Sequence, residues 1–112
     1  MSSGFIETGL SLGASQIHRA LASLQEELEA IDYYHQRWDV AEDQDLKAVM
    51  AFNRNDEMEH AALLLEWLRR SMPEFEVQLR KILFTTGPLT TLPGGADATG
   101  PDGKGLGLGN TK

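Results

Sequence analysis

The chain has 112 residues, a formal charge of -7 at neutral pH and 41% hydrophobic residues, a combination typical of one small soluble domain. It contains no cysteine, which excludes disulfides, thiolate metal ligands and thiol catalysis and suits a reducing cytosol. The acidic balance disfavours nucleic-acid binding through phosphates and favours cations as partners. A core of this size is marginally stable by itself, so we expect a metal or a partner chain to support it.

The first 14 residues have no basic start followed by a long apolar run, so they lack the pattern of a secretory signal. We expect residues 1–14 to form a flexible segment. The longest apolar stretch, residues 61–65, is interrupted by Glu66 and is far too short to span a membrane. These features predict a soluble cytoplasmic protein.

Two segments have the apolar spacing of helices. Between residues 15 and 39 the apolar positions recur at steps of four and three, and His35 occupies the one missing place. These positions are Ile17, Leu21, Leu24, Leu28, Ile31 and Trp38. After a short linker, in which Asp43 suits a helix N-cap, helical spacing returns up to about Ser71. Its positions are Leu46, Met50, Asn53, Glu57, His60, Leu64 and Trp67.

A third, shorter helix is predicted after Ser71, because Ser71-Met72-Pro73-Glu74 combines a capping box with an early proline. Beyond Phe84 the tail holds eight of the eleven glycines and three of the four prolines. Such a tail cannot bury enough surface to order itself. We therefore expect an all-α domain over residues 15–84, built from an antiparallel helical hairpin and a short C-terminal helix, followed by a flexible linker over residues 85–112.

An acid and an imidazole interrupt the apolar face of the second helix. Glu57 and His60 stand where leucines would pack, and burying a carboxylate costs several kcal/mol unless it is paired, protonated or metal-bound. Glu27 lies 15 residues before the turn near residue 42, and Glu57 lies 15 residues after it. An antiparallel hairpin places them at the same height, so we expect Glu27, Glu57 and His60 to converge. The alternative is that Glu57 and His60 pair with Arg54, with each other or with water.

These three residues make half of a known ligand set. Ferritin-like di-iron bundles use two single glutamates and two Glu-x-x-His motifs, and this chain carries one of each. Two hairpins related by a twofold axis would complete the set and form a four-helix bundle. Carboxylates with imidazole suit iron, although manganese or zinc could use the same ligands.

Two stretches, IHRALASLQEELEAIDYYHQR and NRNDEMEHAALLLEWLRR, resemble the encapsulated ferritins of bacteria and archaea. The resemblance covers about Ile17 to Phe84. It implies a ring-like homodecamer of five dimers, with a ferroxidase centre of two irons between two subunits. The ligands it implies are Glu27, Glu57 and His60 from each chain, with Glu57 bridging the irons.

The resemblance also assigns supporting roles. It places Glu26 and Glu29 in a secondary metal site inside the ring, whereas a solvated helix face is the alternative. It places Tyr34 near the centre, with a second-shell or redox role, and burial of the aromatic ring is the alternative. Tyr33 stands where relatives carry tryptophan, a departure that bears on the secondary site.

Two histidines receive a structural interpretation. His18 lies nine residues before Glu27, and we expect it to pack against neighbouring side chains. His35 lies about two turns beyond Glu27, and we expect a packed or interface histidine there. Neither is expected to bind the metal.

The tail carries a separate signal. Its GLGLG segment is similar to the C-terminal peptides that load cargo into encapsulin shells, with Leu106 and Leu108 entering apolar pockets of the shell protein. Asn110 and Thr111 replace the usual final Ser-Leu, which predicts weaker docking, offset by many tethered copies. The implied location is inside an encapsulin nanocompartment in the cytoplasm.

The resemblance implies a ferroxidase that oxidises Fe(II) to Fe(III) with oxygen and supplies iron for storage in the shell. Two other functions remain open. A metal-binding or delivery protein would bind metal without consuming oxygen. An oligomeric interaction module would use the buried Glu and His for pairing specificity, and its dimer would survive chelation.

Overall fold

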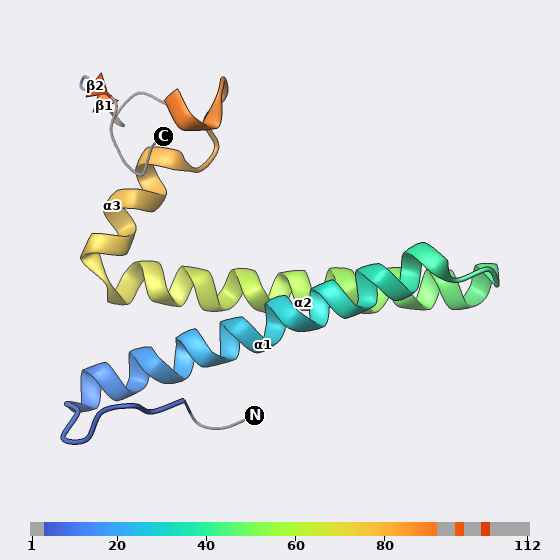
Figure 1. Cartoon of the computed structure of the whole chain (residues 1–112), viewed down its shortest axis with the longest axis horizontal. Coiled ribbons are helices and arrows are strands. Elements are labelled where there is room, and N and C mark those ends of the chain that lie inside the picture. Colours follow the sequence, from blue (N-terminus) through green and yellow to red (C-terminus); the bar gives the residue numbers. More distant parts are fainter. Residues whose placement is uncertain (1–3, 92–95, 98–101, 104–112) are drawn as a thin grey trace. The chain divides into compact units, whose positions relative to one another are not determined.

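A computed structural model describes residues 4–91, 96–97 and 102–103. Its helices are α1 (Leu12–Val40), α2 (Gln44–Ser71) and α3 (Pro73–Ile82), followed by a 3-10 turn, η1, at Leu89–Thr91 (Figure 1). Two-residue strands β1 (Ala96–Asp97) and β2 (Asp102–Gly103) form one antiparallel pair. Helices make up nearly all of the described secondary structure, so the expected all-α class is confirmed. The chain divides into two units, residues 1–71 and 72–112.

The first helix begins earlier than its apolar pattern indicated. Ser11 is the N-cap, and its hydroxyl oxygen accepts a hydrogen bond from the Ala14 amide at 3.1 Å. The helix starts at Leu12, three residues before the predicted Ser15. The apolar pattern begins only at Ile17, so it says nothing about this exposed first turn, whereas the Ser11 cap marks it.

A short turn joins α1 to α2 and fixes how the two helices align (Figure 1). Asp43 accepts a hydrogen bond from the Leu46 amide at 2.9 Å, which confirms the predicted N-cap. The Lys47 ammonium donates to the Trp38 carbonyl at 2.6 Å and lies 4.5 Å from the centre of the Trp38 ring. Lys47 thus satisfies a carbonyl at the C-terminal end of α1, where a cation is electrostatically favoured.

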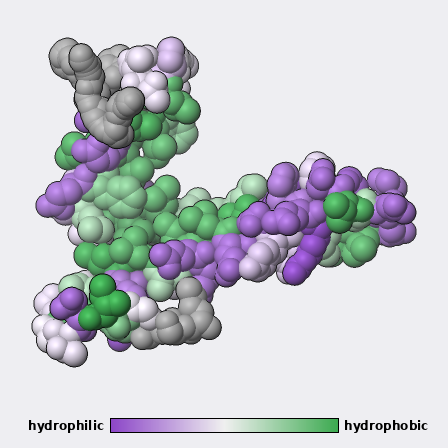
Figure 2. Space-filling model, in the orientation of Figure 1, coloured by the Kyte–Doolittle hydropathy of each residue, from purple (hydrophilic) through white to green (hydrophobic). Residues whose placement is uncertain are grey.

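The hairpin buries little of its apolar surface. Among the described residues only Ala20, Ala61 and Leu68 form a buried core. Leu21 and Leu28, both on the predicted apolar face of α1, are 40% and 53% exposed. Figure 2 shows apolar side chains exposed among hydrophilic ones along the visible face of the hairpin. One hairpin therefore leaves much of its apolar face uncovered, which the marginal size of the chain predicted.

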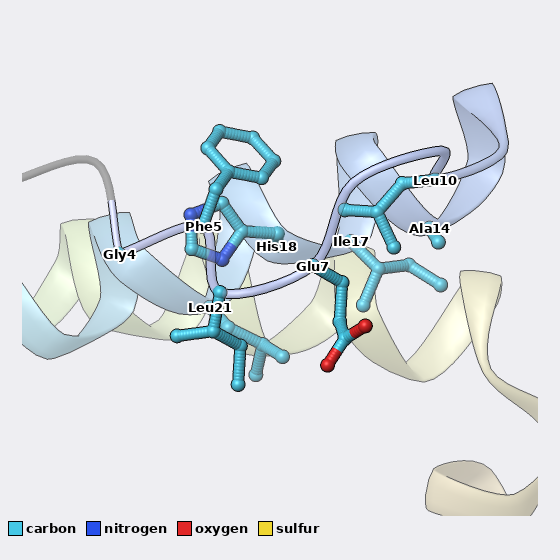
Figure 3. A pocket seen from close by; sticks show the side chains of 9 residues that line it. Gly4, Phe5, Glu7, Leu10, Ala14, Ile17, His18 and Leu21 are labelled. Carbon is cyan, nitrogen blue, oxygen red and sulfur yellow. The ribbon is translucent and has the colours of Figure 1, made fainter.

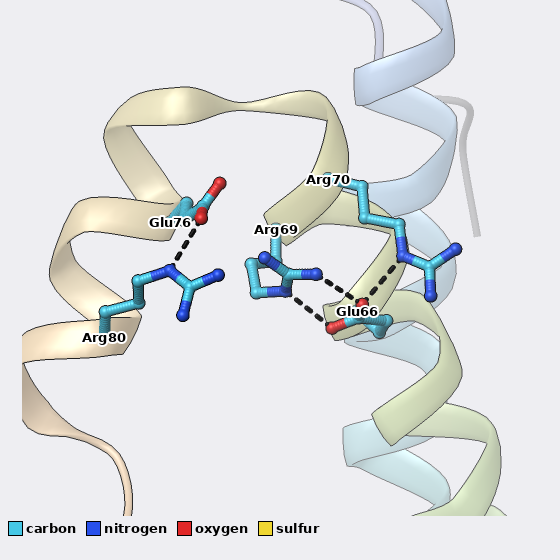
Figure 4. A network of polar contacts seen from close by, with 5 residues as sticks. All are labelled: Glu66, Arg69, Arg70, Glu76 and Arg80. Carbon is cyan, nitrogen blue, oxygen red and sulfur yellow. Dashed lines mark hydrogen bonds and ion pairs between the residues drawn. The ribbon is translucent and has the colours of Figure 1, made fainter.

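Charged side chains stabilise the end of α2 locally. The Glu66 carboxylate accepts hydrogen bonds from Arg69 and Arg70, each at 2.7 Å (Figure 4). These three hydrogen bonds, two from Arg69 and one from Arg70, lower the pKa of Glu66 to about 2. Both arginines lie in the last turn of α2, where positive charge complements the helix dipole. Within α3, the Arg80 guanidinium donates a hydrogen bond to the Glu76 carboxylate at 2.6 Å.

The predicted capping box before α3 is wrong. Ser71 is the last residue of α2, and Met72 occupies the N-cap of α3 without a side-chain hydrogen bond. Pro73 takes the first helical position, where its missing N–H costs nothing.

The described helices include none with the length and hydropathy needed to cross a bilayer.

We predict that Lys47→Met destabilises the hairpin. Loss of the bond to the Trp38 carbonyl should lower the free energy of unfolding by about 1–2 kcal/mol, because a part-buried acceptor is left unpaired. Urea denaturation at fixed protein concentration measures the change. Lys81→Met in α3 is the matched control, and an equal loss in both variants would contradict the anchoring role of Lys47.

Candidate metal centre

Three potential ligands converge between α1 and α2. Glu27, Glu57 and His60 each offer one ligand atom, and these atoms all lie within 4.8 Å of one another. His60 Nδ1 is 3.3 Å from Glu57 Oε1 and 3.6 Å from Glu27 Oε1. The glutamate side chains are about a quarter exposed, at 25% and 24%, and His60 is 44% exposed. The cluster is thus partly buried between the helices and open to solvent on one side.

Local structure explains the convergence. Glu57 and His60 are three residues apart, so both lie on the same face of α2. Glu27 belongs to the other helix, and the turn held by Asp43 and Lys47 brings it level with Glu57. No loop residue contributes to the cluster, so rigid helices hold all three side chains.

The two carboxylates do not ionise independently. The hydrogen bond with Glu57 is the main cause that raises the pKa of Glu27, and burial and the Glu57 charge add to it. The same hydrogen bond lowers the pKa of Glu57, and the contact with His60 lowers it further. The pair therefore retains a proton on Glu27 to a higher pH than an isolated glutamate would.

The imidazole is also affected by its neighbours. Burial lowers the pKa of His60, but the hydrogen bond to Glu57 and the charges of Asp56, Glu27 and Glu57 outweigh it. The net result is a pKa raised above the ordinary value. A divalent cation between these groups would replace protons that the site holds in its absence.

The donor set fits a transition metal. Two carboxylates and one imidazole suit Fe(II), Mn(II) or Zn(II). Three protein ligands leave coordination positions open, which a second metal, a small molecule or side chains of another chain can take. Of the alternative partners, Arg54 is not supported among the described contacts, because it bonds to His35 at 3.0 Å and to Asn55 at 3.2 Å. Glu57 and His60 do pair with each other, at 3.3 Å.

The other predicted site residues lie outside this cluster. Glu26 and Glu29 are exposed, and the Tyr33 hydroxyl donates to Glu29 at 2.8 Å. That bond is the main cause that raises the pKa of Tyr33. Tyr34 is half-buried, and the Arg37 guanidinium lies 5.5 Å from its ring centre. The secondary metal site and the role of Tyr34 stay predictions.

The two remaining histidines have aromatic neighbours. His35 stacks on Trp38, with ring centres 5.4 Å apart. His18 lies 4.0 Å from the Phe5 ring centre, where the N-terminal segment crosses α1 (Figure 3). His18 lines a mainly apolar pocket of about 220 Å³, together with Leu10 and Leu21. Among the described residues, neither histidine belongs to a potential metal cluster.

One contact of the cluster was missed in the sequence. Asp56 Oδ2 lies 3.7 Å from His60 Nε2, on the side of the ring away from the glutamates. The two residues are four apart in α2, and this spacing places them on neighbouring turns of one face. In the sequence, this i, i+4 spacing is the signal that the two side chains can meet.

The fold and the cluster together define a class. An all-helical hairpin that presents Glu on one helix and Glu-x-x-His on the next belongs to the ferritin-like proteins. More particularly, the chain belongs to the EncFtn-like family, whose model matches residues 6–86. It is therefore a ferritin-like, iron-related protein.

Several proteins share much of the sequence. A protein described as "Ferritin-like protein" from Thermotoga maritima is 49% identical over 88 residues, which cover 75% of this chain and 77% of that protein. One described as "Encapsulated ferritin-like protein" from Rhodospirillum rubrum is 45% identical over 107 residues, covering 85% of this chain and 76% of that protein. The crystal structure of protein ne0167 from Nitrosomonas europaea matches with a TM-score of 0.74 and 49% identity, over 77% of this chain and 97% of that one.

We predict that Co(II) binding weakens as the pH falls. The pKa of His60 is raised above its ordinary value, so the imidazole becomes protonated over this range and the metal has to displace that proton. The affinity should then fall by up to about tenfold per pH unit. The raised pKa of Glu27 adds to the loss as the pH falls further. Titrations followed by Co(II) absorption between pH 8 and pH 6 measure this dependence. Glu57→Ala should abolish the signal and Glu59→Ala, on an exposed neighbouring position, should retain it. An affinity independent of pH would contradict the assignment.

Proposed function

We propose that this protein is a ferroxidase, which oxidises Fe(II) to Fe(III) with oxygen at a centre shared by two chains. The observation that carries the proposal is the convergence of Glu27, Glu57 and His60 within 4.8 Å on an open side of the hairpin. Membership of the EncFtn-like family supports iron as the metal. Iron is here the substrate, bound as Fe(II) and passed on as Fe(III).

A second copy of the chain would complete the centre. Four apolar residues lie on the same side of α2 as His60, at helical spacing from it. All four are strongly exposed: Val49, Phe52, Leu63 and Trp67. On α1, Leu28 is 53% exposed beside Glu27. Covering these residues with the same face of another hairpin would bury them and bring two half-sites together about a twofold axis. We propose five such dimers in a ring.

The chemistry follows from two irons held in one site. Each Fe(II) gives up one electron, and oxygen accepts both, so no single-electron product has to leave the centre. The carboxylates of Glu27 and Glu57 stabilise the higher charge of Fe(III), and Glu57, near both the imidazole and Glu27, is the bridging candidate.

The remaining site residues take supporting roles in this proposal. Glu26 and Glu29 attract Fe(II) to the exposed side of α1 before it reaches the centre. The hydroxyl of Tyr33 holds Glu29 in place with a hydrogen bond at 2.8 Å. Tyr34, half-buried on α1, acts near the centre as a hydrogen-bonding or redox-active neighbour.

Storage requires a compartment, because two helices enclose no interior in which mineral can collect. A relative described as encapsulated, from Rhodospirillum rubrum, supports an encapsulin shell as that compartment. We propose that Leu106 and Leu108 dock the chain to the shell protein. Both residues lie outside the described part of the chain.

We predict that ferric formation after addition of Fe(II) in air is fast for the wild type and falls to the buffer rate for Glu57→Ala. Stopped-flow absorbance at matched oligomer size measures both. Glu59→Ala removes one exposed acid from the same turn of α2 and should keep the wild-type rate. If the wild type binds iron but does not oxidise it, the ferroxidase proposal is wrong and the protein is a metal-binding or delivery protein instead.

We predict that Leu106→Ala combined with Leu108→Ala abolishes loading into the shell. The substitutions remove the two apolar side chains proposed to dock and leave the helical domain intact. Co-expression with an encapsulin shell protein, followed by isolation of the shells and quantification of the cargo, measures loading. Leu89→Ala, outside the GLGLG segment, is the control; equal loading of both variants would rule out this docking mode.

A further inference from the structure

The orientation of the His60 ring assigns different tasks to its two nitrogens. Nδ1 faces the glutamates, at 3.3 Å from Glu57 and 3.6 Å from Glu27. Nε2 faces Asp56, whose Oδ2 is 3.7 Å away, within ion-pair distance but longer than a hydrogen bond. A metal held by the two carboxylates would therefore meet the imidazole at Nδ1. Nε2 then faces α2, the helix to which His60 and Asp56 belong.

Only one tautomer of the neutral ring can serve in this arrangement. A neutral imidazole has one N–H and one lone pair, and the metal needs the lone pair. If Nδ1 binds the metal, the hydrogen has to sit on Nε2. In the metal-free site the contact with Glu57 works against this, because Glu57 Oε1, at 3.3 Å, attracts an N–H on Nδ1. Something has to favour the hydrogen on Nε2.

We propose that Asp56 is a positioning residue for His60, holding the hydrogen on Nε2 so that Nδ1 presents its lone pair to iron. The inference rests on the proposed iron site and adds a residue to it. Metal-binding histidines commonly donate their other N–H to a carboxylate, which fixes the tautomer and the ring orientation. Here the carboxylate comes from the preceding turn of the same helix, so its position does not depend on assembly.

Dimer formation strengthens the need for this contact. His60 is 44% and Asp56 51% exposed in the single chain, so water can accept a hydrogen bond from Nε2. Another chain packed on the same face would exclude that water. A buried N–H without an acceptor costs about 1–3 kcal/mol. In our proposal Asp56 closes from 3.7 Å to hydrogen-bond distance and becomes that acceptor from within the chain.

The test compares three variants of the full chain. Asp56→Ala removes the acceptor and the charge, Asp56→Asn removes the charge but keeps an acceptor oxygen, and Glu59→Ala removes a charge from a nearby exposed position. The first readout is the tautomer of His60 in the metal-free protein at pH 9, from nitrogen-15 spectra of histidine-labelled protein. The chain has three histidines, and a His60→Gln spectrum identifies the signal.

The second readout is Co(II) affinity under the same conditions. We expect Asp56→Ala to shift His60 toward the Nδ1–H tautomer and to weaken Co(II) binding about 10–100-fold, the usual effect of losing such a partner. Asp56→Asn should stay close to the wild type in both readouts, and Glu59→Ala should not change. An unchanged tautomer in Asp56→Ala would overturn the proposal, as would equal losses of affinity in all three variants, which would indicate a general charge effect.

Neither readout involves oxygen, so failure of this inference is distinguishable from failure of the ferroxidase proposal. A wild type that binds Co(II) with the expected tautomer but oxidises no Fe(II) would leave Asp56 as a positioning residue in a metal-binding protein. An active wild type with an unchanged Asp56→Ala tautomer would retain the ferroxidase and reject the role of Asp56.

Discussion

The alignment of α1 with α2 is the constraint on which the rest of the molecule depends. Asp43 caps the second helix and Lys47 satisfies a carbonyl at the end of the first, so the two helices meet at a fixed height. A shift of one residue along either helix rotates a side chain by about 100° around the axis. Such a shift would separate Glu27 from Glu57 and His60. The geometry of the candidate centre is therefore set by the turn residues, although these lie several helical turns away from Glu27, Glu57 and His60.

The thin core and the open centre are two aspects of the same arrangement. Only Ala20, Ala61 and Leu68 are buried among the described residues, and the centre has three ligands on a solvent-facing side. The apolar residues that a larger domain would cover lie next to the ligands that a larger site would include. In our proposal one event, pairing with another copy, corrects both deficiencies. Stability and chemistry are then gained at the same surface.

Much of this could be predicted from the sequence, because helix spacing and an antiparallel turn fix which residues share a face. The hairpin, the Asp43 cap and the EncFtn-like family were all predicted correctly. The start of α1 was missed because Ser11 precedes the apolar pattern, and the capping box failed because Ser71 completes α2. The sequence also could not predict that Leu21 and Leu28 are exposed, because apolar periodicity identifies a face but not what covers it. The contact of Asp56 with His60 could have been predicted from their spacing of four residues, which places them on neighbouring turns of one face. The ligand roles of Glu27, Glu57 and His60 stay predictions.

The division of ligands, three to a chain, has a consequence for inheritance. If each centre joins two chains, a cell that makes equal amounts of normal and ligand-deficient protein assembles only about one dimer in four from two normal chains. Half of the dimers would be mixed, with a full ligand set on one side and a damaged one on the other. An altered copy of the gene would then act dominantly, through the assemblies it enters, and not merely by adding inactive protein.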